Sequence, residues 1–220
     1  MKRGASFLKF LFLCVFALIL VYFLSLFIPP VISQGVNDLS SRYVYSAAKK
    51  QAQCLKVVSI AIDEYSLNNL KQRWPWRRAL YADLLKILDK EGVSTVGIDL
   101  VFVGESEDKQ DDFLLSDVLK NISPRVILAY FFDPREGAPV FPLKILKDSA
   151  YSLGMVDTPV DADRKTRRLR GYVELNNETY YSFSAQICAA YLNKKPQEIV
   201  KLLPLSSDKT FFLNYLLKPK

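Results

Sequence analysis

Short apolar runs that alternate with amphipathic segments are the feature of this sequence that most limits its fold. Aliphatic and aromatic residues predominate in 55–62, 94–102 and 125–132, which predicts strands that are buried on both faces. Between these runs, 79–90 and 109–122 carry apolar residues at helical spacing. Strand, helix, strand, helix, strand is typical of a parallel sheet with crossover helices. We therefore predict an α/β fold with a mixed, mostly parallel sheet in a three-layer αβα arrangement.

The second half of the chain carries shorter predicted elements. They are a helix at 141–150, a strand with one solvent-exposed face at 166–175, a turn at 176–179, a helix at 182–194 and a strand at 210–217. No repeat or low-complexity linker interrupts them. Residues 33–220 are therefore predicted to form one domain.

A membrane span is predicted at residues 10–28, which are 19 consecutive residues without a charge. Lys2, Arg3 and Lys9 precede this run, so residues 1–9 are expected in the cytoplasm and the domain outside. A cleaved signal peptide is the alternative, but its apolar region is usually shorter and ends at a small-x-small site. A helix with apolar residues at three- and four-residue spacing, from 36 to 47, would join the anchor to the domain.

Composition removes several classes of chemistry. The chain has no histidine, which excludes His-based metal sites, Ser-His-Asp triads and His proton shuttles. Without the three basic residues ahead of the span, 27 basic and 23 acidic residues remain, which gives no reason to invoke nucleic acid. Cys54 and Cys188 are the thiols outside the span, and they form either one disulfide or two free thiols.

Asp63 directly follows one predicted buried strand, in "IAIDE", and Asp99 lies near the end of the next, in "VGIDL". Ligands of open α/β sheets bind beside the carboxyl ends of strands, so these carboxylates are candidate site residues. Either the two hold Mg²⁺ or share a proton, or each caps the turn or helix that follows, and we favour the capping role. Glu64 and Ser66 could line the same crevice, and Ser66 is also a good N-cap.

Both tryptophans of the chain flank a proline ahead of the first predicted helix. Proline is well tolerated at the start of a helix, where its fixed φ sets the chain direction. Trp74 and Trp76 could cover the sheet edge or close over the crevice, with Arg77 or Arg78 stacked on an indole or paired with one of the two aspartates. Local packing is the interpretation that we favour.

A charged run, "DADRKTRRLR", occupies residues 161–170. Its arginines, Arg167 and Arg168 among them, could grip an anionic ligand through their forked donors. A run of this kind in a turn is usually solvated, which is the interpretation that we prefer.

Several motifs, taken in order, resemble one family of bacterial sensory domains. They are "VVSIAIDEYSL", "RWPWRRALYADLLKIL", "GVSTVGIDLVF", "DDFLLSDVLK", "LGMVDTPVDADRKTRRLR" and "SFSAQICAAYL". Together they are similar to the CHASE domain of the second type, over about residues 34–216. The chain departs from the family pattern at Arg77, where a proline is usual, and at Arg164, where a glycine is usual.

The resemblance implies an extracytoplasmic sensor in the bacterial cytoplasmic membrane that detects an unknown small molecule without a cofactor. It implies an effector beyond this chain, in cis or in trans, which is an adenylate cyclase, a histidine kinase or a serine/threonine kinase. The chain would then be part of a longer protein or act through a partner, and a homodimer is expected. The candidate ligand contacts are Asp63, Glu64, Ser66, Trp74, Trp76, Arg78, Asp99, Arg167 and Arg168. The alternatives are a metal-dependent phosphoester hydrolase that uses Asp63 and Asp99, and a passive membrane-anchored adaptor.

Overall fold

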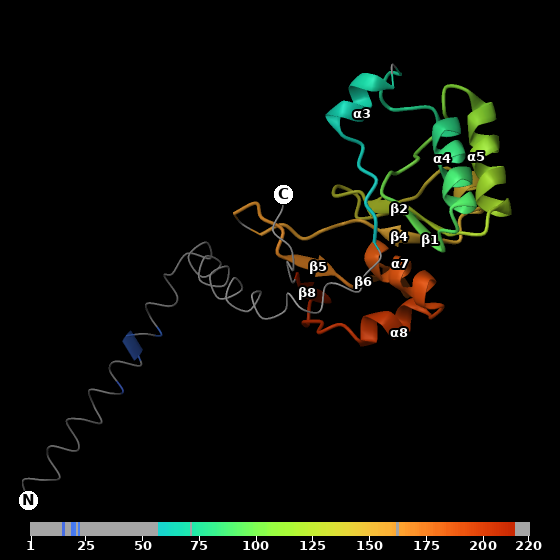
Figure 1. Ribbon diagram of the computed structural model, residues 1–220. Coiled ribbons are helices and arrows are strands. Elements are labelled where there is room, and N and C mark those ends of the chain that lie inside the picture. The colour runs from blue at the N-terminus through green and yellow to red at the C-terminus, as the bar shows by residue number, and fades with distance from the viewer. Residues whose placement is uncertain are drawn as a thin grey trace, which may run out of the picture. The chain divides into compact units, whose positions relative to one another are not determined.

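The computed structural model describes residues 57–70, 72–161 and 163–213, together with Val15, Ile19, Leu20 and Tyr22 (Figure 1). The chain divides into two units, of which one comprises 57–160 and 166–213 and the other 1–56, 161–165 and 214–220. The predicted cytoplasmic segment 1–9, the helix 36–47 and, apart from the four residues above, the span 10–28 lie outside the described residues.

In the part of the chain that the structure describes, no helix has both the length and the apolar character that crossing a membrane requires.

A parallel sheet lies at the centre of the unit 57–160 and 166–213. Strand β2 (Arg125–Phe132) pairs in parallel with β1 (Thr95–Ile98) on one side and with β4 (Ser152–Met155) on the other. The short strand β3 (Pro139–Val140) pairs antiparallel with the end of β2. Five successive residues of β2 are buried, as expected of a central strand that is covered on both faces. The prediction of a mixed, mostly parallel sheet is confirmed.

Three helices cover one face of this sheet: α4 (Arg78–Lys90), α5 (Lys109–Asn121) and the short α6 (Lys144–Lys147). Figure 1 shows α4 and α5 side by side. Alternate residues of a strand face opposite sides, and Val126 and Leu128 of β2 face these helices. The buried residues that the helices contribute to this core are Tyr81, Ala82, Leu85, Leu115, Val118, Leu119 and Leu146. The predicted helix at 141–150 is thus shorter than expected.

The opposite face is covered by helix α7 (Phe183–Leu192), which approaches the strands closely at two glycines. A Cβ atom on Gly154 would collide with the backbone of Phe183, and one on Gly97 with the side chain of Ile187. Glycine at both positions therefore lets the helix lie close against the strands. Helices on both faces make this unit three-layered, as predicted.

Smaller elements follow the sheet. Helix α8 (Pro196–Lys201) packs against α7 around Ala185, Ala189, Ile199 and Val200. The predicted strand 166–175 is interrupted at Gly171 into β5 (Arg168–Arg170) and β6 (Tyr172–Leu175). Strand β5 pairs with β8 (Thr210–Phe212), and β6 pairs with β7 (Glu178–Tyr181). The predicted strand 210–217 thus appears as β8, and its residues from 214 on lie outside the described part.

The turn between β6 and β7 falls at Asn176 and Asn177, which both have positive φ. Asparagine tolerates this backbone region better than most residues, because its short side chain can hydrogen-bond locally. The predicted turn at 176–179 is confirmed at its first two residues, whereas Glu178 and Thr179 belong to β7.

The first predicted strand is wrong over its described part. Residues 57–63 are irregular, and the exposed fractions of Val57 and Val58 are 79% and 84%. They lead into α3 (Glu64–Asn69), which lies away from the sheet in Figure 1 and contains no buried residue. An apolar run reports that a segment can be buried, but it does not by itself supply the neighbours that bury it.

Candidate functional site

The residues predicted around Asp63 form the start of helix α3. The Asp63 Oδ1 accepts hydrogen bonds from the Ser66 backbone N, at 2.8 Å, and from the Ser66 Oγ, at 2.7 Å. These bonds lower the pKa of the Asp63 carboxyl. Glu64 is the first residue of the helix and is exposed. Asp63 is therefore the N-cap of α3, so the capping role is confirmed for Asp63, and the cap of this helix is Asp63 and not Ser66.

The two tryptophans divide between core and surface. Trp76 has an exposed fraction of 8% and belongs to the core under α4 and α5. Trp74 has an exposed fraction of 44% and contacts Trp76 edge to face, with 5.4 Å between ring centroids. The peptide bond between Trp74 and Pro75 is cis. Packing accounts for Trp76, whereas Trp74 presents an aromatic surface to solvent on a rigid support.

The buried indole nitrogen of Trp76 has no hydrogen-bond partner among the residues that the structure describes. An indole N–H removed from water normally finds an acceptor. This donor is therefore a polar group that the local packing leaves unsatisfied.

Arg78 is buried at the start of α4 and is held by the start of α5. Its Nη1 donates to Asp112 Oδ1, and its Nη2 donates to the carbonyl oxygen of Gly104 at 2.7 Å. The guanidinium also lies over the Phe102 ring, 5.5 Å from the centroid. Asp112 accepts two further bonds, from the Oγ and the backbone N of Ser106. The charge of Arg78 is thus matched inside the protein.

Arg77, next to Arg78, also bonds to aspartates at the start of α5, but it lies closer to solvent. Its Nε and Nη2 donate to the two carboxylate oxygens of Asp111, both at 2.8 Å, and Nη2 also donates to Asp108 at 2.9 Å. This forked pairing lowers the pKa of Asp111 and raises that of Arg77. We call Arg77, Arg78, Asp108, Asp111 and Asp112 the Arg–Asp clamp, because they tie the first turns of two parallel helices together.

The clamp replaces one interpretation from the sequence. Neither Arg77 nor Arg78 pairs with Asp63 or Asp99, so that expectation is wrong. The pairs 77–111 and 78–112 are both 34 positions apart. Two successive strand–helix units can place adjacent arginines beside adjacent aspartates in this way. The paired charges are visible in "RWPWRR" and "KQDD". Predicting that they pair would have required the knowledge that the two helices are neighbours.

Asp99 lies just beyond the end of β1 and is exposed. It makes no hydrogen bond or ion pair with the described residues, and no interaction there joins it to Asp63. Within the same part of the chain, no group of three or more acidic or cysteine residues is arranged to hold a metal ion. The described geometry therefore gives the hydrolase alternative no support.

Arg167 and Arg168 lie beside the antiparallel pair β5–β8. Arg167 is buried, and Arg168 Nη1 donates to Asp208 at 3.2 Å. Asp208 also accepts hydrogen bonds from the hydroxyls of Thr210, at 2.7 Å, and Ser206, at 2.8 Å. These bonds and the guanidinium lower the pKa of Asp208 to about 2. Arg168 is therefore engaged within its own domain and is not only a solvated charge.

Comparison with known proteins identifies the family. The family model named CHASE2 domain matches residues 13–218. The chain belongs to the CHASE2 family. This confirms the resemblance read from the motifs, and CHASE2 is a family of sensory domains of bacterial signalling proteins, found as extracytoplasmic sensors in membrane proteins. Neither the search of curated proteins nor the search of solved structures found a match.

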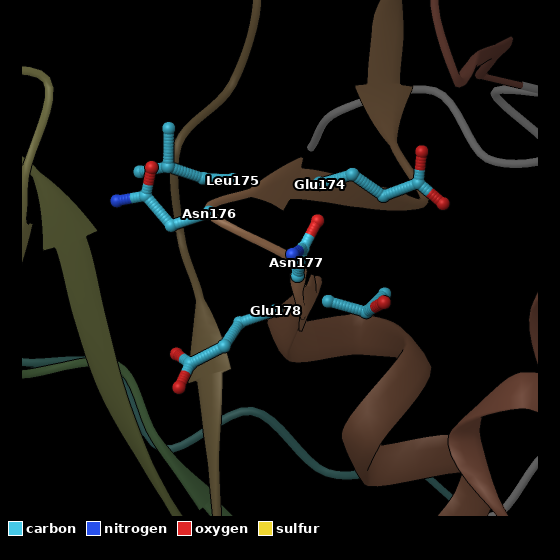
Figure 2. Close-up of a pocket in the computed structure, with 6 residues that line it drawn as sticks. Glu174, Leu175, Asn176, Asn177 and Glu178 are labelled. Carbon is cyan, nitrogen blue, oxygen red and sulfur yellow. The ribbon is translucent and has the colours of Figure 1, made fainter.

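The two hollows described in this CHASE2 domain lie away from most of the predicted contacts. One, of about 420 Å³, is lined by Glu174, Leu175, Asn176, Asn177, Glu178 and Thr179 at the β6–β7 turn. Figure 2 shows that the carboxylates of Glu174 and Glu178 point to opposite sides of this turn. A smaller hollow, of about 220 Å³, borders the clamp at Asp112. Acidic groups therefore do not converge on one point at the turn.

Arg77 and Arg164 give the family departures a structural meaning. A proline at position 77 could not supply the bonds to Asp108 and Asp111. Arg164 has φ +62°, a region that glycine adopts without strain. The first departure, at Arg77, adds an ion pair. The second, at Arg164, places a residue with a side chain in a backbone conformation that favours glycine. Cys188 is a free, exposed thiol on α7, and Cys54 lies outside the described residues, so the two predicted alternatives, one disulfide or two free thiols, are not decided.

Proposed function

We propose that this CHASE2 chain is the extracytoplasmic input domain of a membrane-anchored bacterial signalling protein. It detects a small molecule outside the cytoplasmic membrane and passes the signal to an effector that lies outside these 220 residues. That effector is an adenylate cyclase, a histidine kinase or a serine/threonine kinase, in cis or in trans, and the domain acts as a homodimer. The observation that carries this proposal is the family match, which extends over residues 13–218.

The ligand is proposed to bind at the exposed face around Trp74 and Asp99. An exposed indole supported by a buried one offers apolar contact area with little loss of side-chain entropy on binding. Asp99 has no partner among the described residues, so a ligand can pair with it without displacing an internal bond. Arg78, in contrast, is proposed to position the helix and not to bind, because Asp112 and Gly104 already take its donors.

The remaining candidates are ranked behind these two. Asp63, Glu64 and Ser66 would act together, because the cap fixes them at the start of α3. Arg167 and Arg168 would contribute only by exchanging an internal partner for a ligand.

The chain's own tryptophans provide the binding assay, because Trp74 lies at the proposed face and contacts Trp76, the other tryptophan of the chain. The full chain in lipid nanodiscs is titrated with amino acids, dicarboxylates, hexoses and inorganic phosphate while tryptophan emission is recorded. We expect a saturable change with one of these classes. Calorimetry should show at least tenfold weaker binding for Trp74→Ala and Asp99→Asn, and unchanged binding for Tyr65→Ala, an exposed aromatic control on α3.

The location is tested separately. Alkaline phosphatase fused after Lys220 folds only outside the cytoplasm, so the fusion should be active. An inactive phosphatase fusion together with a fluorescent cytosolic fusion would overturn the proposed topology. The proposed ligand face would be overturned if none of the tested compounds bound saturably, or if the Trp74→Ala variant bound its ligand as tightly as the wild type.

A further inference from the structure

Strand β1 has an edge that no described residue pairs with. It bonds to β2 on one side, and no described backbone hydrogen bond reaches it from the other. Its residues are only half-buried or exposed, although its sequence is "TVGI", whereas β2 is buried through its middle. An open apolar edge in an otherwise covered parallel sheet is unusual, since it exposes unpaired backbone groups.

One apolar segment of the same unit is not buried in the core. Residues 57–62 read "VVSIAI", and all six are exposed. The exposed fractions of Ile60 and Ile62 are 59% and 36%. No hydrogen bond ties the backbone of 57–62 to another described segment. The composition is that of a strand covered on both faces, but the covering is missing in this arrangement.

The handedness of the fold specifies where such a segment would fit. The chain passes from β1 through α5 to β2, and from β2 through α6 to β4, with each strand parallel to the last. Helices α4, α5 and α6 all lie on one face. Parallel crossovers are almost always right-handed, so each step on one face moves the chain in the same direction across the sheet. The segment ahead of α4 therefore belongs on the side of β1 that faces away from β2.

We propose that residues 57–62 dock on the free edge of β1 as a further parallel strand, and that docking and release are two states of the sensor. The connection from 63 to 94 is longer than the dozen residues that a parallel crossover needs. Docking would carry Asp63 to the carboxyl edge of the sheet, where Asp99 lies. The proposed docking rests on the topology of the sheet, whereas its role in signalling rests on the proposed sensory function.

Hydrogen–deuterium exchange on the full chain in nanodiscs tests the docking. We expect the amides of 58–62 to exchange at least tenfold more slowly than unstructured chain. Ile60→Asp should remove this protection and speed exchange in β1 at least tenfold, with β2 unchanged. Tyr65→Asp is the matched control, since it places the same charge on an exposed apolar residue just beyond the segment, and it should leave both segments as in the wild type.

The wild-type measurement keeps the proposal testable even if Ile60→Asp does not fold. Exchange of 58–62 at unstructured rates would overturn the docking, as would an Ile60→Asp variant in which β1 is unaffected. Protection of β1 that rises with protein concentration and is insensitive to residue 60 would assign the edge to a second copy of the chain, and would equally overturn the proposal. A chain that binds no ligand would still show the protection, so failure of the sensory function and failure of docking are separate results.

Discussion

Removing one partner of the Arg78–Asp112 pair should cost more stability than replacing both. The side chains of Arg78 and Asp112 have exposed fractions of 8% and 5%. Removing one partner of a buried pair leaves an uncompensated charge and typically costs about 3 to 5 kcal/mol. Asp112→Leu alone should therefore lower the free energy of unfolding by about that amount. In Arg78→Met/Asp112→Leu no charge is stranded, so the double variant should lose only about 1 to 2 kcal/mol, chiefly from the bonds that Asp112 makes to Ser106.

Urea unfolding followed by tryptophan emission measures these differences. With a slope of about 2 to 3 kcal/mol per molar urea, a loss of about 4 kcal/mol moves the midpoint down by roughly 1 to 2 M. Lys144→Met is the control, because the Lys144–Asp148 pair is solvent-exposed and should be worth less than about 1 kcal/mol. A double variant as unstable as the sum of its singles, or an Asp112→Leu variant within 1 kcal/mol of wild type, would refute the assignment of a buried pair.

Three further outcomes are expected in the same unfolding assay. Arg164→Gly should raise the free energy of unfolding by up to about 1 kcal/mol, since φ +62° suits glycine, and a loss of stability would contradict this. Gly154→Ala should destabilise by about 1 to 3 kcal/mol or more, because its Cβ meets helix backbone, and Gly97→Ala should cost less, because a side chain can move; the reverse order would be contrary evidence. Asp208 has a folded pKa of about 2, below its unfolded value near 3.8, so its contribution is full above pH 4 and is lost as pH falls toward 2; Asp208→Asn should flatten this part of the stability profile, and an unchanged profile would count against it.

The sheet and its helices were predictable because each element carries a local signal. Strand β2 was predicted correctly to its last residue from seven apolar or aromatic positions that follow Arg125, and α5 to within one residue of its end. The strand at 55–62 carried the same signal and is irregular where it is described. Its burial depends on an edge contributed by residues more than thirty positions later, which no local pattern encodes.

The site residues were less predictable for a related reason. Asp63 was recognised as a candidate cap from its place at the end of a predicted strand, ahead of a turn or helix, which is a local relation. The partners of Arg77 and Arg78 are three aspartates on the next helix, and a pairing across 34 positions depends on how two helices lie side by side. The sequence could supply the charges but not the distance between them.

The energies of these contacts indicate which part of the domain is able to carry a signal. A ligand shifts a conformational equilibrium only by its difference in binding free energy between the two states, typically about 1 to 3 kcal/mol. In order to rearrange, the body formed by α4, α5 and the parallel sheet would have to expose several side chains that are buried between them, at about 1.5 to 3 kcal/mol for each large one. Residues 57–63 and α3 bury no side chain, so moving them breaks no core contact. A ligand with a binding free-energy difference of this size should therefore move the segment ahead of α4, while the Arg–Asp clamp keeps the rest of the unit rigid.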